Sequence, residues 1–208
     1  EDGVKASTAQ EFTFIIITSP STRYYSGDIN LLVEEKYTRA SQGGVGFAKA
    51  AGNYAASFYP TRQANKKGFQ QVVWTDSIEH KYIEECGTMN IWFRIGNKLA
   101  TPQLSDSILD GITRKSVIAL ANDMGIDVQE KKVSVDELFE AYNNNKLTEV
   151  FGSGTAVGIS PIRSITFRGE KMSFTNNNDS ISSKLKMKLQ SIQMGVTFDS
   201  HNWITKIH

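Results

Sequence analysis

The sequence has only one cysteine, four prolines and three histidines among its 208 residues. Cys86 cannot form a disulfide within the chain, and no second cysteine exists to pair with it in a metal site. His80, His201 and His208 are too scattered for a local metal-binding motif, so we predict no metal. A chain without disulfides is typical of a reducing compartment, which predicts the cytoplasm.

Long apolar runs and a strong charge of one sign are also lacking. The apolar stretch from Phe14 to Ile17 is far shorter than the roughly 20 residues that a membrane-spanning helix needs. Residues 1–10 are polar and small, unlike a signal peptide. With 23 basic and 22 acidic residues, the formal net charge of +1 gives no general attraction to phosphate backbones or anionic lipids. We therefore expect neither a membrane nor nucleic acid as a partner.

What is present is the composition of an ordinary folded protein, with 39% hydrophobic residues and 16 glycines. The length allows one large domain or two small ones, and no linker divides the chain. Predicted strands and helices alternate without a repeat, which indicates a layered α/β or α+β domain.

Strands are predicted where aromatic and β-branched residues cluster between turn residues. The first, Phe12–Thr18, is rich in Phe, Ile and Thr and ends at Ser19-Pro20, so we expect it to be buried. Further strands are expected at residues 29–37, 71–75, 82–85 and 89–95, and from residue 126. Those between residues 71 and 95 are predicted to form a meander, with Gly96-Asn97 as the next turn.

Helices are predicted where apolar residues recur three or four positions apart. One is expected to bury a stripe from Phe47 to Phe58, with Lys49 pointing away from it. Asp110 is the expected N-cap of a second helix, and Ser134 has capping-box spacing for a third. The last helix is predicted to bury Ile181, Leu185, Leu189 and Ile192 and to leave Lys184, Lys186 and Lys188 in solvent.

Two segments could hold a phosphate, namely residues 110–113 at a helix start and the glycine-rich residues 152–155. A helix N-terminus offers unpaired N–H groups, and a threonine hydroxyl adds a donor. Neither segment has the Gly-Lys-Ser/Thr ending of a Walker loop. Each segment taken alone is more often a plain cap or turn.

Four motifs together carry a specific resemblance: Ala48–Tyr54, Glu84–Asn90, Gly111–Arg114 and Phe151–Ala156. In order and spacing they resemble the fold-type IV aminotransferases, which use pyridoxal phosphate. Lys-x-x-Gly-Asn-Tyr begins at Lys49, and Glu-x-Gly-Thr-Met-Asn resembles the branched-chain amino acid aminotransferases in particular. The similarity extends over nearly the whole chain.

The resemblance implies an α+β fold, the large cofactor-binding domain of the D-amino acid aminotransferase-like fold, with a mixed sheet or pseudo-barrel and surrounding helices. Residues 11–208 would form this domain. Residues 1–10 would be the tail of a smaller N-terminal domain and the linker, with that domain absent from this chain. Since the small domain supplies part of the family's site, we expect the chain alone to have little turnover.

The resemblance also implies roles for individual residues. Lys49 would form a Schiff base with the cofactor aldehyde and then serve as the proton-transferring base. Tyr54 would hydrogen-bond the cofactor's O3′. Glu85 would accept a hydrogen bond from the pyridinium nitrogen. Glu84 would point to the opposite side of its strand, because side chains alternate there.

The remaining implied roles concern phosphate and substrate. Ile112, Thr113 and Thr155 would bind the phosphate. Thr155 and Ala156 would meet the substrate carboxylate through their amides, and Thr88 would line the substrate pocket. Asp110 stands where the family motif has a proline, which places an acidic residue near the expected phosphate.

The function implied is transfer of the amino group of leucine, isoleucine or valine to 2-oxoglutarate, giving glutamate, by a homodimer. Three alternatives stay open: a D-amino acid aminotransferase, an aminodeoxychorismate lyase, or a non-catalytic dimerisation module of the same fold. Retention of the five residues Lys49, Tyr54, Glu85, Thr113 and Thr155 disfavours the module, which has no need of them.

Overall fold

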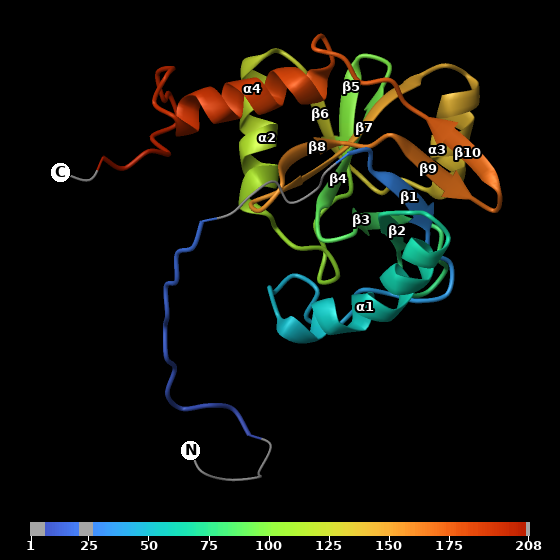
Figure 1. Cartoon of the computed structure of the whole chain (residues 1–208), viewed down its shortest axis with the longest axis horizontal. Helices are drawn as coiled ribbons and strands as arrows, with labels where there is room; N and C mark the ends of the chain where they lie inside the picture. Colours follow the sequence, from blue (N-terminus) through green and yellow to red (C-terminus); the bar gives the residue numbers. More distant parts are fainter. Residues whose placement is uncertain (1–6, 21–26, 207–208) are drawn as a thin grey trace.

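The computed structural model describes residues 7–20 and 27–206. Within these ranges, ten strands form two five-stranded sheets, accompanied by four helices (Figure 1). The mixed architecture confirms the expected fold class. None of the described helices is long and apolar enough to cross a membrane. The predicted domain boundary at residue 10 stays a prediction, because residues 1–6 lie outside the described ranges.

The first sheet has the order β10-β9-β1-β2-β3. Its strands are β1 (Asn30–Val33), β2 (Gln71–Thr75), β3 (Ile83–Cys86), β9 (Ser164–Phe167) and β10 (Glu170–Ser173). β1 is central and parallel to both β2 and β9, whereas β3 and β10 pair antiparallel at the two edges. Parallel neighbours on both sides bury β1, and Leu31 and Val33 are accordingly in the core.

The second sheet has the order β6-β5-β4-β7-β8. Its strands are β4 (Asn90–Ile95), β5 (Lys98–Thr101), β6 (Asp127–Glu130), β7 (Leu147–Gly154) and β8 (Gly158–Pro161). β5 and β6 are parallel, and the other pairs are antiparallel. Trp92 on β4 lies opposite Phe151 on β7, and their rings stack with centroids 5.8 Å apart.

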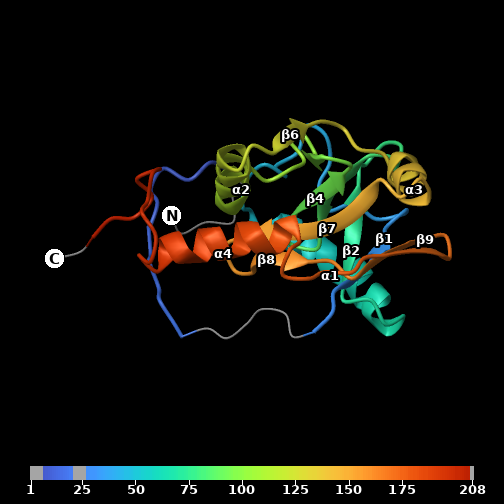
Figure 2. The same ribbon diagram turned by 90° about the horizontal axis from the view of Figure 1, so that it is seen from above.

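The helices are α1 (Ala51–Lys66), α2 (Ile112–Asp123), α3 (Val135–Asn143) and α4 (Ile181–Gln193). α2 and α4 lie together against the second sheet, at the opposite end of the molecule from α3 (Figures 1 and 2). Side chains of β4 alternate between two cores: Ile91 and Phe93 pack toward the first sheet, whereas Trp92 packs with α2 and α4. The core that contains Ile91 and Phe93 is therefore shared by the two sheets, and the core around Trp92 lies on the other face of the second sheet.

Several local expectations are confirmed. Ser134 caps α3, because its Oγ accepts a hydrogen bond from the Glu137 N–H at 3.0 Å. In α4, Leu185, Leu189 and Ile192 are buried as predicted, and Lys184 is exposed. The prediction is only partly met by Ile181, Lys186 and Lys188, which are half-buried. Both patterns depend on residues within one or two helical turns, so the sequence alone specifies them.

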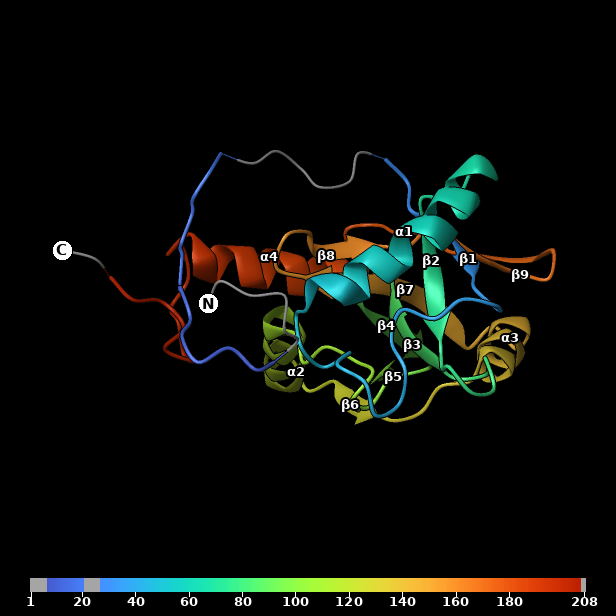
Figure 3. The same ribbon diagram turned by 90° about the horizontal axis from the view of Figure 1, so that it is seen from below.

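The prediction that the first helix buries an apolar stripe from Phe47 to Phe58 is wrong. α1 begins at Ala51, so Phe47 and Lys49 precede it, and Phe58 is 68% exposed. The buried face instead consists of the small or polar residues Asn53, Ser57, Pro60 and Ala64. Small side chains let α1 approach β2 closely, and α1 lies beside β2 in Figure 3. Ala64 packs there with Val72 and Trp74.

The buried strand expected at Phe12–Thr18 is also wrong. The structure shows no strand there, and Phe12, Phe14 and Ile17 are 84–88% exposed. The segment extends away from both sheets (Figure 1). High strand propensity does not bury a segment unless a sheet edge and an apolar surface accept it.

Two further expectations need correction. The N-cap of α2 is Gly111, while the Asp110 carboxylate pairs with the Lys115 amine at 2.6 Å. The chain also changes sheets between β3 and β4, so the expected meander is divided. The Cys86–Met89 bridge closes the tight turn in which this change occurs.

Gly46 lies against the backbone of Ser107, and a Cβ there would be 2.5 Å from the Ser107 Cα. We expect Gly46→Ala to lower the free energy of unfolding by roughly 1–3 kcal/mol, because backbone must shift to admit the methyl group. Gly52→Ala is the matched control, since a Cβ at Gly52 meets no atom within 4 Å. Urea unfolding of the two variants checks this, and equal stabilities would contradict it.

Candidate active site

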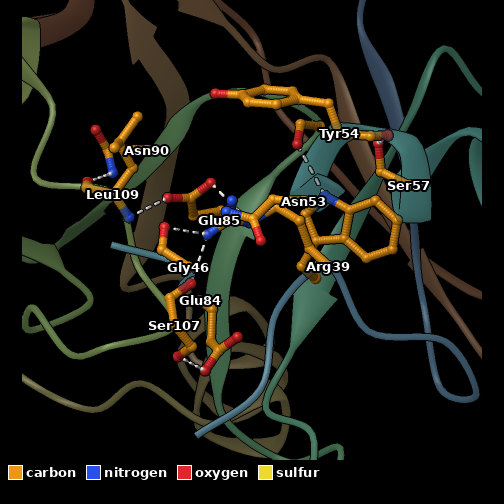
Figure 4. Close-up of polar contacts among 12 residues, drawn as sticks. Arg39, Gly46, Asn53, Tyr54, Ser57, Glu84, Glu85, Asn90, Ser107 and Leu109 are labelled. Carbon is orange, nitrogen blue, oxygen red and sulfur yellow. Dashed lines mark hydrogen bonds and ion pairs between the residues drawn. The ribbon is translucent and has the colours of Figure 1, made fainter. Parts of the chain in front are cut away.

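Glu85 is the buried centre of a polar cluster at the end of β3 (Figure 4). Its side chain lies next to Arg39, whose Nε is 3.1 Å from Oε2. The Leu109 N–H donates to the other oxygen, Oε1, at 2.8 Å. A carboxylate has about four acceptor positions, so Glu85 can accept a further hydrogen bond.

Arg39 contacts three segments of the chain around the Glu85 carboxylate. Besides pairing with Glu85, its Nη2 donates to the carbonyl oxygens of Gly46 and Ser107. The side chain is only 4% exposed, so these bonds are made away from water. Arg39 therefore links β3, the loop before α1 and the loop before α2.

Burial raises the pKa of Glu85 from 4.5 to about 7. The Arg39 guanidinium and the Leu109 N–H act in the opposite direction, and the Lys49 amine also lowers this pKa. The neighbouring carboxylate of Glu84 raises it. Glu85 thus prefers a proton or a cation beside it near neutral pH.

Lys49 and Tyr54 meet at the start of α1. The Lys49 amine donates to the Tyr54 hydroxyl at 3.1 Å and lies 4.8 Å from the ring centroid. Asn53 holds the preceding turn, because its Nδ2 donates to the carbonyl oxygens of Val45 and Ala48. Lys49 is exposed and Tyr54 half-buried, so the amine is accessible to a ligand.

The N-terminus of α2 is the second part of the site. Gly111 at the N-cap provides no side-chain cap, and Ile112 and Thr113 form the first turn. A Cβ at Gly111 would collide with the Asn90 Oδ1, while the Asn90 Nδ2 donates to the Leu109 carbonyl oxygen at 2.8 Å. This close approach requires glycine and positions the helix dipole next to the Glu85 cluster.

Two turns complete the surroundings. Thr88 is exposed between β3 and β4, and Thr155 and Ala156 are exposed between β7 and β8. A Cβ on Gly154 would lie 3.7 Å from the Thr88 carbonyl oxygen, so the turns are adjacent. Successive backbone N–H groups of a turn can form a concavity that binds an anion.

The structure thus joins three of the predicted parts, namely Glu85, the loop with Lys49 and the start of α2, through a few scaffold contacts. Leu109 connects Glu85 to the helix start with Ile112 and Thr113, and Arg39 connects Glu85 to the loop that carries Lys49. The sequence does not indicate a role for four residues of the site: Arg39, Asn53, Asn90 and Leu109. Asn53 and Asn90 belong to motifs that carry the family resemblance, but nothing local in the sequence indicates that the Leu109 N–H binds Glu85.

The family model for class IV amino-transferases matches residues 2–165. The chain belongs to the class IV aminotransferase family. This aminotransferase chain is 47% identical, over 99% of its length, to a probable branched-chain-amino-acid aminotransferase of Staphylococcus epidermidis. It is 44% identical, again over 99% of its length, to the branched-chain-amino-acid transaminase 1 of Bacillus subtilis.

The fold is similar to that of solved members of this group. The crystal structure of the branched-chain amino acid aminotransferase from Thermobaculum terrenum, in its PLP form, superposes with a TM-score of 0.73 at 26% identity. That match covers 86% of this chain and 55% of the other. The class IV aminotransferase chain spans 58% of the length of the two bacterial relatives.

Proposed function

We propose that this chain is the cofactor-binding part of a branched-chain amino acid aminotransferase that uses pyridoxal phosphate. The observation that carries the proposal is the assembly of the Lys49–Tyr54 pair, buried Glu85 and the uncapped start of α2 around one set of scaffold contacts. The family match and the names of the relatives support this choice.

The donors and acceptors fit such a cofactor. An accessible amine beside a phenol suits the aldehyde end, and a buried carboxylate with unused acceptor positions suits a ring N–H. The first turn of α2 has free N–H groups and a positive dipole end, which suit a phosphate. The Asp110 carboxylate forms an ion pair with Lys115, so its negative charge next to the expected phosphate is compensated.

Pyridoxal phosphate, when bound, supplies a ring that accepts electrons from the substrate carbon next to the amino group. Lys49 would hold the cofactor covalently through Nζ and, once displaced by a substrate amine, would carry the proton to and from that carbon. The Tyr54 hydroxyl oxygen, 3.1 Å from Nζ, would orient the Lys49 amine by accepting a hydrogen bond from it.

Glu85 would keep the ring nitrogen protonated by accepting a hydrogen bond from its N–H group. In the chain itself the carboxyl has a pKa of about 7, because burial outweighs the Arg39 charge. A second cation at the ring would stabilise the ionised form further. Arg39 forms an ion pair at Oε2 and the Leu109 N–H donates a hydrogen bond to Oε1, and the two contacts would hold the carboxylate in place for the ring.

Two exposed backbone segments would bind the anionic groups. Ile112 and Thr113 at the start of α2 would bind the phosphate, with Thr155 as a further donor. The Thr155 and Ala156 amides would bind the substrate carboxylate, and Thr88 on the adjacent turn would border the substrate side chain. Each lies at an accessible turn or helix end except Thr113, which is 8% exposed.

We further infer leucine, isoleucine or valine as amino donors and 2-oxoglutarate as acceptor, in a homodimer of the cytoplasm. The relatives named as branched-chain enzymes favour this substrate class over D-amino acids or aminodeoxychorismate. The buried free thiol of Cys86 is consistent with a reducing compartment. In a chain of the relatives' full length, a substrate panel comparing leucine, isoleucine and valine with D-alanine distinguishes the alternatives, and preference for D-alanine would overturn the assignment.

Borohydride reduction of the chain with pyridoxal phosphate is expected to attach the phosphopyridoxyl group to the Lys49 peptide. The reason is that Lys49 is the lysine placed beside Tyr54 and within electrostatic reach of Glu85. Peptide mapping by mass spectrometry checks this. A label spread over exposed lysines such as Lys184 would refute the role of Lys49, and a colourless, unlabelled protein would favour a non-catalytic module.

A further inference from the structure

Asn90 is a buried polar residue to which the proposed function gives no role. It is the first residue of β4 and is 6% exposed. It also ends the Glu-x-Gly-Thr-Met-Asn motif that begins at Glu85. A buried side-chain amide requires hydrogen-bond partners, so the groups that Asn90 contacts indicate what it does.

Both ends of the Asn90 amide contact the segment that leads into α2. Its Nδ2 donates to the Leu109 carbonyl oxygen at 2.8 Å. Its Oδ1 lies where a Cβ on Gly111 would be, so only glycine lets the N-cap of α2 approach this closely. Trp92, two positions along β4 and on the same face of the strand, belongs to the same core as α2. Asn90 therefore holds the start of α2 beside the strand.

Leu109 is held through both of its backbone polar groups. Its carbonyl oxygen accepts the Gly111 N–H at 2.9 Å as well as the Asn90 amide, which closes a tight turn just before α2. Its N–H donates to Glu85 Oε1 at 2.8 Å. Glu85 and Asn90 flank the turn between β3 and β4, and Figure 4 shows them on either side of Leu109. One turn of the chain thus fixes the segment that joins Glu85 to the start of α2.

This arrangement sets the spacing between two parts of the proposed cofactor site. Glu85 is proposed to accept from the ring, and the first turn of α2 is proposed to bind the phosphate. The attraction of a helix start for an anion falls off within its first turn, so displacement of Gly111 would weaken phosphate binding. Glu85 would still be paired with Arg39. Loss of Asn90 should therefore affect the phosphate end and spare the ring end.

We propose that Asn90 is a positioning residue that gives the site its preference for a phosphate-bearing cofactor. This inference rests on the proposed function. Asn90 acts through Leu109 and Gly111, since its hydrogen bond and its close contact are made with these two residues. It holds the first N–H groups of α2 where they can bind the phosphate while Glu85 accepts a hydrogen bond from the ring.

The first test compares the dissociation constants of pyridoxal 5′-phosphate and of pyridoxal, which lacks the phosphate, by absorbance titration of the chain. Asn90→Ala is expected to weaken binding of pyridoxal 5′-phosphate about tenfold, the effect of losing one hydrogen bond. Its affinity for pyridoxal should be unchanged. Asn97→Ala, the same change in the exposed turn after β4, should match the parent for both ligands. Equal weakening of both ligands, or parental affinity for pyridoxal 5′-phosphate, would overturn the proposal.

The second test needs no cofactor. Amide hydrogen exchange, measured by NMR, reports how often the turn before α2 opens. In cofactor-free Asn90→Ala, the Gly111 N–H should exchange about tenfold faster, because the carbonyl oxygen that accepts it is no longer held. The Glu137 N–H, bonded to Ser134 in α3, should keep its parental rate. Unchanged exchange at Gly111 would reject the proposal. If the parent binds neither ligand, the proposed function fails, and these rates then decide whether Asn90 positions α2.

Gly111→Ala tests the same contact from the other side. Its methyl group would collide with the Asn90 Oδ1, so affinity for pyridoxal 5′-phosphate should fall more than affinity for pyridoxal. In the double variant Asn90→Ala/Gly111→Ala the collision is removed, and the loss should be no greater than in the weaker-binding single variant. Losses that multiply would show that the two residues act independently and would contradict the proposal. Urea unfolding establishes whether each variant folds. Should Asn90→Ala fail to fold, Gly111→Ala decides, and equal losses for the two ligands would then refute the role of Asn90.

Discussion

Replacing Lys49 with alanine is expected to abolish both covalent attachment of pyridoxal phosphate and transamination. The amine is proposed to hold the cofactor and to transfer the proton, and Lys49 is the described lysine whose amine contacts Tyr54. Loss of a positioned proton-transferring group alone lowers rates by about 10²–10⁴-fold. Because Lys49 is exposed and precedes α1, the fold should be unaffected.

The measurement is absorbance of the cofactor-loaded protein together with turnover of leucine. Lys184→Ala on the exposed side of α4 is the matched control and should behave like the parent protein. Turnover is best compared in a chain of the relatives' full length, since this chain spans 58% of them and is expected to turn over little substrate alone. A Lys49→Ala protein that keeps parental turnover would reject the proposed mechanism.

The elements best predicted from sequence are those specified by local patterns. The cap of α3 depends on Ser134 and Glu137, three positions apart, and the buried face of α4 on its own apolar spacing. In both cases the partner surface only has to be apolar. Pattern and structure therefore agree.

The failures share a physical cause, which is that burial depends on the partner. Phe12–Thr18 has every local property of a buried strand, yet no sheet edge covers it in the structure. In α1, close packing on β2 selects the side with Asn53 and Ala64, and leaves the bulkier Phe58 outside. Neither outcome can be predicted from periodicity.

In the site, too, some features follow from local sequence patterns and others depend on tertiary packing. Alternation along a strand, combined with the motif, selected Glu85 over Glu84, and the structure gives the two carboxylates different surroundings. The pairing of Glu85 with Arg39 and Leu109 joins segments distant in sequence. Such contacts depend on how the two sheets and their loops pack, so no local pattern contains them.

Glu85→Gln is expected to change how stability depends on pH. The pKa of Glu85 is raised from 4.5 to about 7 in the folded chain, so the folded state holds a proton that the unfolded state has lost between these values. The contribution to stability is then complete below about pH 4.5 and is lost as pH rises through about 7. Between about pH 4.5 and 8, the parent should lose roughly 3 kcal/mol relative to Glu85→Gln.

Urea unfolding of both proteins across this range, without cofactor, measures the difference, and Glu170→Gln on exposed β10 should follow the parent. The sign of the difference decides between two opposing effects on the same carboxylate. If pairing with Arg39 outweighed burial, the parent would instead gain stability relative to Glu85→Gln as pH rises. That outcome would contradict the raised pKa.

The same substitution should affect the reaction through a different property of Glu85. Glutamine still accepts a hydrogen bond from the Leu109 N–H, so the local geometry survives, but it has no charge to stabilise a protonated ring nitrogen. We expect turnover to fall on the order of 10²-fold, as when one preorganised electrostatic contact is removed. A carboxylate needed only to neutralise buried Arg39 would give the altered pH dependence of stability with unchanged turnover, so the two measurements together separate a structural role from a catalytic one.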